Sequence, residues 1–358
     1  MISEKFISVV IPNYNNAATI GKCLEAAFLS IYTNFEVIVV DDNSNDNSVE
    51  IIKRFPCRLL EFREHRGASC ARNTGAFSSR GDFIFLTDSD CLLNKDTLSI
   101  INKTLSITEP DVIIGGTYTK TPYDKGFFNL FQSLFVYYSE TKRADKPDYI
   151  AAHAMVMSTQ IFRKQNGFPE EFLPIIEDVE FTHRLRREGC KLVVNPQIQV
   201  RHIFNFSFNR SLINAVRKSM YWTMYSIGNR DLLTDSGSAS TELKVNVISA
   251  FSSLLLLILW VFSERPSFLY PIPVIFILNL FVSRGLVKTF HETGGIIFAG
   301  LASIYYTLFY SLSVGTGTVA GMAKYFFGHR LTQTKRQTQR HKGTKWQREE
   351  KVAKGKFK

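Results

Sequence analysis

The cysteines of this chain form no recognisable pattern. There are five, an odd number, and no two are spaced as CxxC. Neither a disulfide framework nor a zinc site is therefore indicated. The first residues also lack the basic flank, long apolar core and small-residue cleavage site of a secretory signal. These absences predict reduced cysteines and an N-terminal part that stays in the cytosol.

Most of the chain has little excess charge of either sign. The net charge is +11, but residues 328–358 hold eleven Lys or Arg against Glu349 and Glu350 and so account for +9 of it. The remainder carries no broad positive field for a polyanion, which argues against a nucleic-acid partner. We expect the basic tail to face the cytosol and to meet anionic lipid.

Long uncharged runs are missing before residue 244 and frequent after it. They cover residues 245–262, 268–283 and 296–323. The first and third are long enough to cross about 30 Å of hydrocarbon, and three such runs together favour membrane helices over buried core helices. Three full spans would place the basic tail outside, against the positive-inside tendency. We therefore expect two full spans and one shorter or re-entrant segment, either the second, with its prolines, or the glycine-rich half of the third.

The first 210 residues alternate short β-branched runs with helical patterns. Residues 19–32 and 48–55 are predicted helices, and the first carries an apolar stripe. This alternation predicts an α/β fold with a mainly parallel sheet and flanking helices. Ligands of such sheets bind beyond the carboxyl ends of the strands, here after Val40 and Leu86. The predicted strands are residues 6–11, 35–40, 58–62, 83–86, 112–115 and 191–194.

Two further segments, residues 126–139 and 212–227, are rich in aromatic side chains. Either interfacial helices or ordinary packing on the sheet would explain them. The expected organisation is a catalytic domain, a linker of amphipathic helices, a membrane region and a basic tail. These parts cover residues 1–210, 211–244, 245–327 and 328–358.

Acidic pairs follow two of the predicted strands. Asp41 and Asp42 come directly after the second, where a carboxylate can accept hydrogen bonds from a nucleobase. An Asx-turn that caps the next helix is the structural alternative. Asp88 and Asp90 follow the fourth predicted strand, at the spacing that lets two carboxylates hold Mg²⁺ or Mn²⁺ on a diphosphate.

A third acidic cluster, Glu177, Asp178 and Glu180, opens a predicted helix. One of these carboxylates could act as a general base toward an acceptor hydroxyl, although acids also stabilise the first turn of a helix through its dipole. His202 follows the last predicted strand and is a candidate metal ligand or a packed histidine.

Five motifs occur in one order along residues 6–205. They are Ser8-Val-Val-Ile-Pro12-Asn-Tyr14-Asn15, Val39-Val-Asp41-Asp42-Asn-Ser44, Arg66-Gly67-Ala-Ser-Cys-Ala71-Arg72-Asn73-Thr-Gly75, Gly81-Asp82-Phe83-Ile84 with Asp88-Ser89-Asp90, and Asn166-Gly167-Phe168-Pro-Glu170-Glu171-Phe172 with Glu177-Asp178. In content and order they resemble glycosyltransferase family 2, the inverting transferases with the GT-A fold. The resemblance implies an enzyme that moves a sugar from a UDP- or GDP-sugar. Together with the apolar runs and the N-terminal sequence, it predicts a membrane-anchored member of this family whose catalytic domain lies on the cytosolic side of the inner membrane.

The resemblance also implies roles for individual residues. Asp178 would be the base, with Glu177 as the runner-up. Asp90 and His202 would ligate a divalent cation, Mn²⁺ or Mg²⁺, with Asp88 near it or near the ribose. The expected donor-binding residues are Pro12, Tyr14, Asp42, Arg72, Asp88 and Ser89.

Two departures from the family pattern bear on the acceptor. The chain has no Q-x-x-R-W motif after Asp178, which favours transfer of one sugar to a lipid-linked or membrane-proximal glycan. Residues 151–155 lack the Gly-Asn pair of many relatives. Alternatives are a polyprenyl-phosphate glycosyl synthase, a nucleotidyltransferase and a non-catalytic membrane scaffold. The second of these expects a glycine-rich basic loop behind the first strand, where Pro12-Asn-Tyr-Asn-Asn16 stands instead.

Overall fold

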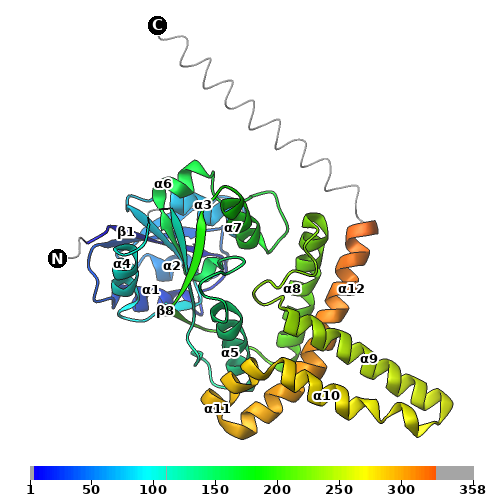
Figure 1. Cartoon of the computed structure of the whole chain (residues 1–358). Helices are drawn as coiled ribbons and strands as arrows, with labels where there is room; N and C mark the ends of the chain where they lie inside the picture. The colour runs from blue at the N-terminus through cyan, green and yellow to red at the C-terminus, as the bar shows by residue number, and fades with distance from the viewer. Residues whose placement is uncertain (1–3, 110, 328–358) are drawn as a thin grey trace.

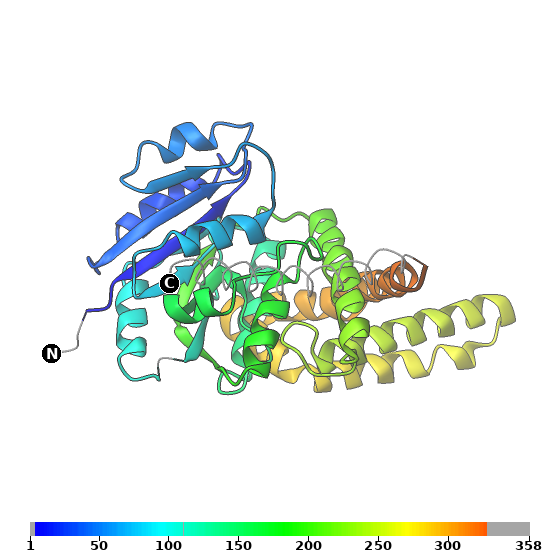
Figure 2. The same cartoon turned by 90° about the horizontal axis from the view of Figure 1, so that it is seen from above.

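The computed structural model of the chain describes residues 4–109 and 111–327. An α/β part carries the sheet, and a group of long helices lies beside it (Figure 1). The helix pair α9 (Thr241–Ser263) and α10 (Pro271–Val282) extends away from the rest of the molecule, which is seen most clearly from above (Figure 2). The basic tail lies outside the described residues.

The sheet has eight strands in the order β3-β2-β1-β4-β7-β6-β8-β5. The first four are parallel to one another, whereas β7 is antiparallel to both neighbours and β5 is antiparallel to β8. The sheet is therefore mixed but mainly parallel. The strands are β1 (Ile7–Asn13), β2 (Phe35–Asp41), β3 (Arg58–Glu61), β4 (Phe83–Leu86), β5 (Cys91–Leu93), β6 (Val112–Tyr118), β7 (Met155–Ser158) and β8 (Lys191–His202).

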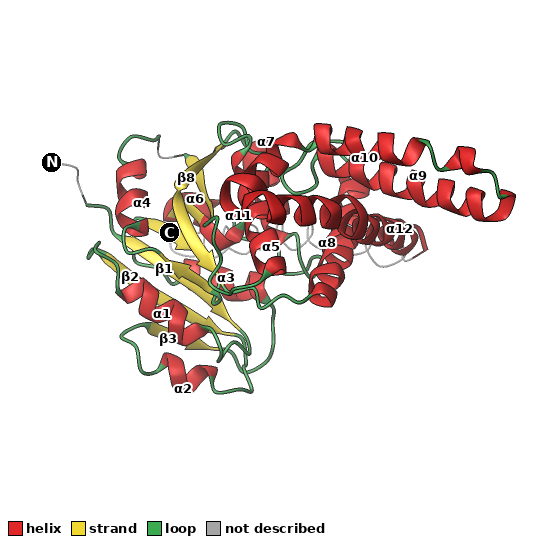
Figure 3. Cartoon of the chain, turned by 90° about the horizontal axis from the view of Figure 1, so that it is seen from below, coloured by secondary structure: helices red, strands yellow, loops and turns green. Residues whose placement is uncertain are grey.

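Alternating apolar side chains let the central strands bury both faces of the sheet. Val9 and Val39 belong to the core under α1 and α4, whereas Val10 belongs to the core under α3, α6 and α7. Figure 3 shows helices on both sides of the strands. The shorter helices are α1 (Ile20–Phe28), α2 (Ser48–Ile52), α3 (Ala68–Phe77), α4 (Thr97–Leu105), η1 (Ala152–Ala154), α6 (Thr159–Lys164) and α7 (Glu177–Arg187).

The predicted strands are all present, but several are longer than predicted. The last one, predicted to end at Val194, continues as β8 to His202 through Pro196, because β6 and β5 pair with it on its two sides. Strands β5 and β7 were not predicted, since runs of three and four residues carry too little periodicity. The helix predicted over residues 19–32 ends at Phe28.

The C-terminal helices include two that are long and apolar enough to cross a membrane, by length and composition alone. They are Thr241–Ser263 and the stretch Arg284–Phe327, with mean hydropathies of 2.3 and 1.5. Gly295 interrupts the second with φ 78°, a conformation that favours glycine. The remaining helices are α5 (Phe127–Thr141), α8 (Phe208–Asn229), α9 (Thr241–Ser263), α10 (Pro271–Val282), α11 (Arg284–Ile304) and α12 (Ser311–Phe327), with the short 3-10 turn η2 (Pro266–Phe268) and the π-turn η3 (Tyr305–Tyr310) between them.

Helix α5, formed by one of the two aromatic-rich segments, is packed inside the protein. Its Phe131 and Leu134 are fully buried in one apolar cluster with Phe290 and Tyr306 of the C-terminal helices. Helix α5 thereby joins the sheet, through β6, to the long helices. The C-terminal part is thus attached to the α/β part by a shared core.

Helices α8 and α12 approach each other closely along two glycines. A Cβ on Gly317 would overlap the Val216 carbonyl oxygen and Ser219 Oγ, and one on Gly321 would overlap the Met220 carbonyl oxygen. Small residues four apart let helix backbones come together, as in membrane helix pairs. Because of these glycines, a re-entrant segment in the third apolar run was one of the alternatives predicted from the sequence. In the structure they lie within the continuous helix α12 and allow it to pack closely on α8.

We expect Gly317→Ala to lower the free energy of unfolding by about 1–3 kcal/mol, because the added methyl group overpacks the contact with α8. Gly300→Ala is the matched control, since no atom lies within 4 Å of its added Cβ and the better helix propensity of alanine gives up to about 1 kcal/mol. Thermal unfolding of the full-length protein in one detergent compares the two. Equal stabilisation by both substitutions would contradict the packing argument.

Candidate active site

The carboxyl end of β2 carries Asp42, whose side chain is buried. Its two oxygens accept the backbone N–H groups of Arg66, at 2.6 Å, and Gly67, at 2.8 Å. His65 Nδ1 lies 2.9 Å from the same carboxylate. Gly67 has φ 90° and so turns the chain directly into α3. Asp42 is thereby fixed in one orientation at the mouth of the sheet.

Asp41 has a structural role instead. It accepts hydrogen bonds from Asn13 Nδ2, Ser44 N and Ser44 Oγ at 2.7–2.9 Å. The Asx-turn, which the sequence analysis gave as the structural alternative for Asp41 and Asp42, is therefore present at Asp41.

Two aromatic rings lie beside Asp42. The Tyr14 and His65 ring centroids are 4.2 Å apart, and 42% of Tyr14 is exposed. Pro12 and Tyr14 stand at the end of β1, and Asn16 Nδ2 donates to Ser89 Oγ at 2.7 Å, which ties the loop after β1 to the loop after β4. The sequence reasoning did not single out His65, which stands in a charged loop without a local signal.

Arg72 joins two of the predicted acids. Its guanidinium donates to Asp88 Oδ1 at 2.7 Å and to Glu177 Oε1 at 2.6 Å, and it is 7% exposed. Burial opposes ionisation of Asp88, but the charge and hydrogen bond of Arg72 outweigh it and lower its pKa. Burial, together with the charge on Asp178, raises the pKa of Glu177 despite Arg72. Arg72 thus holds the loop after β4 to the start of α7, and its expected role in donor binding stays a prediction.

Asp178 stands in the first turn of α7 and is held by backbone donors. Ala152 N donates to Oδ2 at 3.1 Å and Val179 N to Oδ1 at 2.9 Å. Ile176, directly before the first residue of α7, has φ 81°, which is rare for a β-branched side chain and costs about 1–3 kcal/mol. Such strain concentrates at functional sites, so it supports a functional role for this helix start.

Asp90 and His202 meet because β5 pairs with β8. In that register Cys91 faces His202, and His202 Nε2 lies 3.4 Å from Asp90 Oδ1. Burial, and then the charge on Asp88, raise the pKa of Asp90 to about 7, although 32% of its side chain reaches solvent. Burial lowers the pKa of His202 to about 3, so its imidazole is neutral at physiological pH.

This group fits a hard divalent cation. A carboxylate and a neutral imidazole are both ligands that Mn²⁺ accepts, and one atom each of Asp90, Cys91 and His202 lies within 4.8 Å of the others. Burial raises the pKa of Cys91, so its thiol stays protonated and is a poor ligand. His202 Nδ1 is buried with no hydrogen-bond partner among the described residues.

A cavity of about 690 Å³ opens between the α/β part and the long helices. Arg72, Asp88, Glu177, Asp178 and His202 line its polar end. Asp90 touches this end through His202, whereas Asp42 lies further along the sheet edge, with β1 between β2 and β4. The structure therefore brings the predicted base and metal ligands together and sets the predicted nucleobase residue apart.

The sequence reasoning missed a buried group in the same cavity. His153 stacks on Tyr118 with ring centroids 4.1 Å apart and has its Nε2 3.5 Å from Glu140 Oε1. Burial opposes protonation of His153, but the Glu140 charge prevails and raises its pKa. The available sequence signals were Glu140, an acid at the end of the aromatic-rich segment of α5, and the place of His153 within residues 151–155, where the chain departs from the family pattern.

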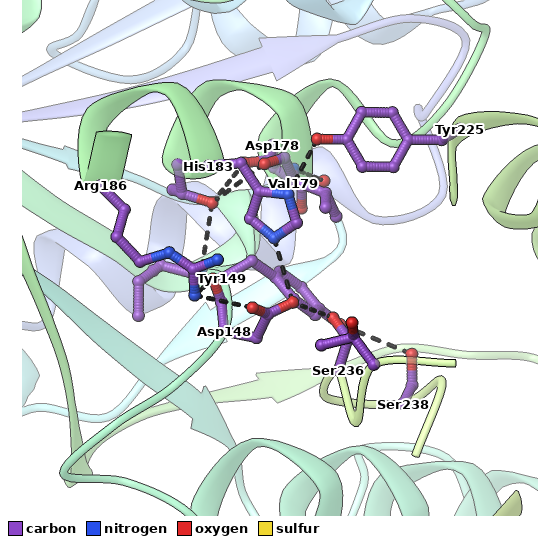
Figure 4. A network of polar contacts seen from close by, with 12 residues as sticks. Asp148, Tyr149, Asp178, Val179, His183, Arg186, Tyr225, Ser236 and Ser238 are labelled. Carbon is purple, nitrogen blue, oxygen red and sulfur yellow. Dashed lines mark hydrogen bonds and ion pairs between the residues drawn. The ribbon is translucent and has the colours of Figure 1, made fainter. Parts of the chain in front are cut away.

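The polar network around Asp178 extends along α7 to Asp148 and His183 (Figure 4). Asp148 accepts from Arg186 Nη1 at 2.7 Å and from Ser236, and its Oδ2 lies 3.0 Å from His183 Nε2. His183 Nδ1 is 2.9 Å from the Tyr225 hydroxyl of α8. The helix that presents Asp178 is thereby tied both to α8 and to the loop before α9.

We expect Asp148→Asn to destabilise the protein at neutral pH by about 2 kcal/mol, because charged hydrogen bonds are lost. Burial opposes ionisation of Asp148, but hydrogen bonds from His183 and Ser236 lower its pKa. The contribution is therefore complete above the unfolded value of about 3.9 and is lost as the pH falls below it. Thermal unfolding should show a steeper loss of stability for the native chain than for the variant between about pH 5 and pH 3. Asp145→Asn, at an exposed position of the same loop, is the control, and equal acid sensitivity of Asp148→Asn and the native chain would contradict the argument.

Comparison with known proteins identifies the class. Residues 8–166 match the model described as Glycosyl transferase family 2. It is 33% identical over 130 residues to the glycosyltransferase GlyG of Streptococcus pneumoniae, covering 35% of this chain and 43% of GlyG. It is 34% identical over 120 residues to the poly(ribitol-phosphate) beta-N-acetylglucosaminyltransferase TarP of Staphylococcus aureus, covering 31% of this chain and 36% of TarP. The chain thus spans less than half the length of these two curated relatives.

A solved structure resembles almost the whole chain. The mannosyltransferase PcManGT of Pyrobaculum calidifontis, in complex with GDP-Man and Mn²⁺, superposes with a TM-score of 0.55 at 16% identity, over 91% of this chain and 88% of that one. At this identity the likeness concerns the fold. The mixed, mainly parallel sheet with flanking helices is the GT-A fold, followed here by long apolar helices.

Proposed function

We propose that this protein is an inverting glycosyltransferase that moves one sugar from a nucleotide-diphosphate sugar to a lipid-linked or membrane-proximal acceptor, with the help of a divalent cation. One observation carries the proposal. His202, which lies 3.4 Å from Asp90, and the backbone-held carboxylate of Asp178 on α7 line one and the same cavity.

The donor side fits a nucleotide sugar. Strands β2 and β4 are separated by β1, so Asp42 and Asp90 follow strands that are roughly 10 Å apart. That separation suits a nucleobase near Asp42, Tyr14 and His65 with the diphosphate near Asp90. PcManGT, whose fold is similar, was solved with GDP-Man and Mn²⁺, which supports this ligand class.

Asp90 and His202 would hold the cation, with Asp88 engaged by Arg72 beside them. When bound, a divalent cation offsets the negative charge that develops on the departing diphosphate. Among the carboxylates that line the cavity, Asp178 is the better base, since Glu177 is already bonded to Arg72. Asp178 takes the proton of the acceptor hydroxyl while the hydroxyl oxygen bonds to the anomeric carbon and the bond between that carbon and the diphosphate breaks. A single displacement of this kind inverts the anomeric configuration.

The apolar helices favour attachment to a membrane. Only 11% of the most apolar stretch of α9 is buried inside the protein. Helix α10 has 12 residues and is therefore about 18 Å long, which is too short to cross about 30 Å of hydrocarbon. We infer that α9 and the helix after Gly295 enter the bilayer, that α10 is the shorter segment, and that the sheet faces the cytosol. Confinement of enzyme and acceptor to one plane raises their encounter rate.

The test is a binding and turnover screen of the full-length protein in detergent. UDP- and GDP-sugars are offered with Mn²⁺, Mg²⁺ or EDTA, and release of the nucleoside diphosphate is measured. The proposal expects at least one nucleotide sugar to bind and to be cleaved only with a metal. Failure of every nucleotide sugar to bind would overturn it.

A further inference from the structure

The cavity continues well beyond the candidate active site, into the helices that follow it. Its walls there come from one face each of α8, α9 and α12. On each helix the residues that line the cavity recur about every four positions, so they lie on the same face. Representative residues are Ala215 and Trp222 of α8, Leu243 and Val247 of α9, and Val314 and Met322 of α12.

The two ends of the cavity differ in chemistry. Asp178 and His202 line one end, and the apolar side chains of α8, α9 and α12 line the other. Lys218 of α8 also lines the cavity, and its charge acts on His202. It forms no ion pair or hydrogen bond with any residue that the structure describes, whereas Arg72 is held by two carboxylates. Lys244 of α9 lines the cavity as well, but its ammonium group donates a hydrogen bond to the Thr234 carbonyl oxygen. Among the described residues that line the cavity, Lys218 is therefore the cation that is left without a protein partner.

We infer that this cavity is the acceptor site, and that the acceptor is a lipid with an anionic head group, whose chain lies between α8, α9 and α12. The anionic group meets Lys218, whose charge acts on His202, and the hydroxyl that attacks the sugar is left to face Asp178. This inference rests on the proposed function and names its substrate class. Three features support a lipid over a free glycan or peptide.

The first feature is the lining, because a glycan site would need hydrogen-bonding groups where Val247, Val314 and Met322 stand. The second is the volume of about 690 Å³, which falls in the range of about 300–1,000 Å³ typical of small-ligand sites. The third is access. Helix α9 supplies Leu243, Val247 and Ile248 to the cavity, and Ile248 is 68% exposed, so the cavity is open to solvent or lipid at this helix. Leu255 and other apolar side chains further along α9 are exposed too, so a lipid can pass from the bilayer along this helix.

The test uses the full-length protein in detergent and an isoprenoid alkyl monophosphate with a diazirine near the end of its chain. After irradiation, we expect the label on cavity residues of α8, α9 and α12, and unlabelled alkyl phosphate should compete for it. Val314→Trp, which fills the apolar end, should reduce the labelling about tenfold. Val319→Trp is the matched control, since Val319 is 61% exposed on the same helix and does not line the cavity.

The head group is tested separately. Lys218→Met should weaken binding of the alkyl phosphate about tenfold while leaving binding of the uncharged alcohol of the same chain unchanged. Arg217→Met is its control, because Arg217 is exposed and outside the cavity. Nucleotide-sugar binding to each variant, by titration calorimetry, shows whether the donor side is intact, so a variant that fails to fold is recognised.

The outcomes separate the two proposals. Label spread over the outer surface of α9 and α10, equal in Val314→Trp and Val319→Trp, would overturn the lipid site while nucleotide-sugar binding leaves the proposed function standing. If Lys218→Met weakened binding of the alkyl phosphate and of the alcohol equally, the inference of an anionic head group would be overturned. Cavity labelling without nucleotide-sugar binding would refute glycosyl transfer, and the acceptor assignment would fall with it.

Discussion

Asp178→Asn is expected to lower kcat for glycosyl transfer by about 10²–10⁴-fold, the usual contribution of a general base. The asparagine keeps the shape of the side chain and can still accept the N–H of Ala152 or Val179, but it cannot take the acceptor proton. Binding of the nucleotide sugar should persist, because Asp42, Asp90 and His202 are unchanged. Single-turnover measurement with saturating donor separates the chemical step from binding.

Glu180→Gln on the same helix is the control for this substitution. Its carboxylate lies near Arg184 and Arg187 and does not line the cavity, so turnover should stay unchanged. A small effect of Asp178→Asn with transfer intact would point to a phosphate nucleophile, which needs no strong base, and so to a polyprenyl-phosphate glycosyl synthase. Unchanged function in cells after loss of Asp178 would instead support a non-catalytic role.

Asp90→Ala and His202→Ala are each expected to lower kcat/KM by about 10²–10³-fold. Stabilisation of the leaving diphosphate by a metal amounts to several kcal/mol, and each 1.36 kcal/mol is about tenfold in rate. Mn²⁺ binding, measured by calorimetry or electron paramagnetic resonance, should weaken in parallel. Asp96→Asn, at an exposed position just before α4, is the control. If Asp90→Ala and His202→Ala both bound Mn²⁺ as tightly as the native protein does, the cation would have to bind elsewhere.

The same site predicts a pH dependence for Mn²⁺ binding. The pKa of Asp90 without a metal is about 7, so a proton must leave before the carboxylate can bind the cation, whereas His202 is neutral well below that pH. Mn²⁺ affinity of the native protein should therefore rise between about pH 6 and pH 8. This slope should disappear in Asp90→Ala.

Local sequence patterns were sufficient for the parallel half of the sheet. The runs before Asp42 and Asp88 are β-branched or aromatic and end in turn residues, so both the strands and the acids at their ends could be predicted. The strands β5 and β7 could not, because their short runs are held in the sheet by neighbours far along the chain, as Cys91 is by His202.

The candidate site depended on contacts that no local pattern contains. Arg72 and Glu177 are 105 positions apart in sequence and bond at 2.6 Å. His153 and Glu140 come from different elements, and nothing in their immediate sequence marks either as buried beside Asp178. Residue types at strand ends predict candidates, but the pairing of those candidates depends on how the elements pack.

The sequence by itself determined the class of fold, the acids at the strand ends and the change to apolar helices after residue 244. Each of these arises from side chains that are close together along the chain, through periodicity, turn chemistry and hydropathy. Only the tertiary structure decided that Arg72 bonds two acids, that Glu140 faces His153, and that the cavity continues from Asp178 between α8, α9 and α12. Those features are set by the packing of distant segments, in which long-range contacts outweigh local preference.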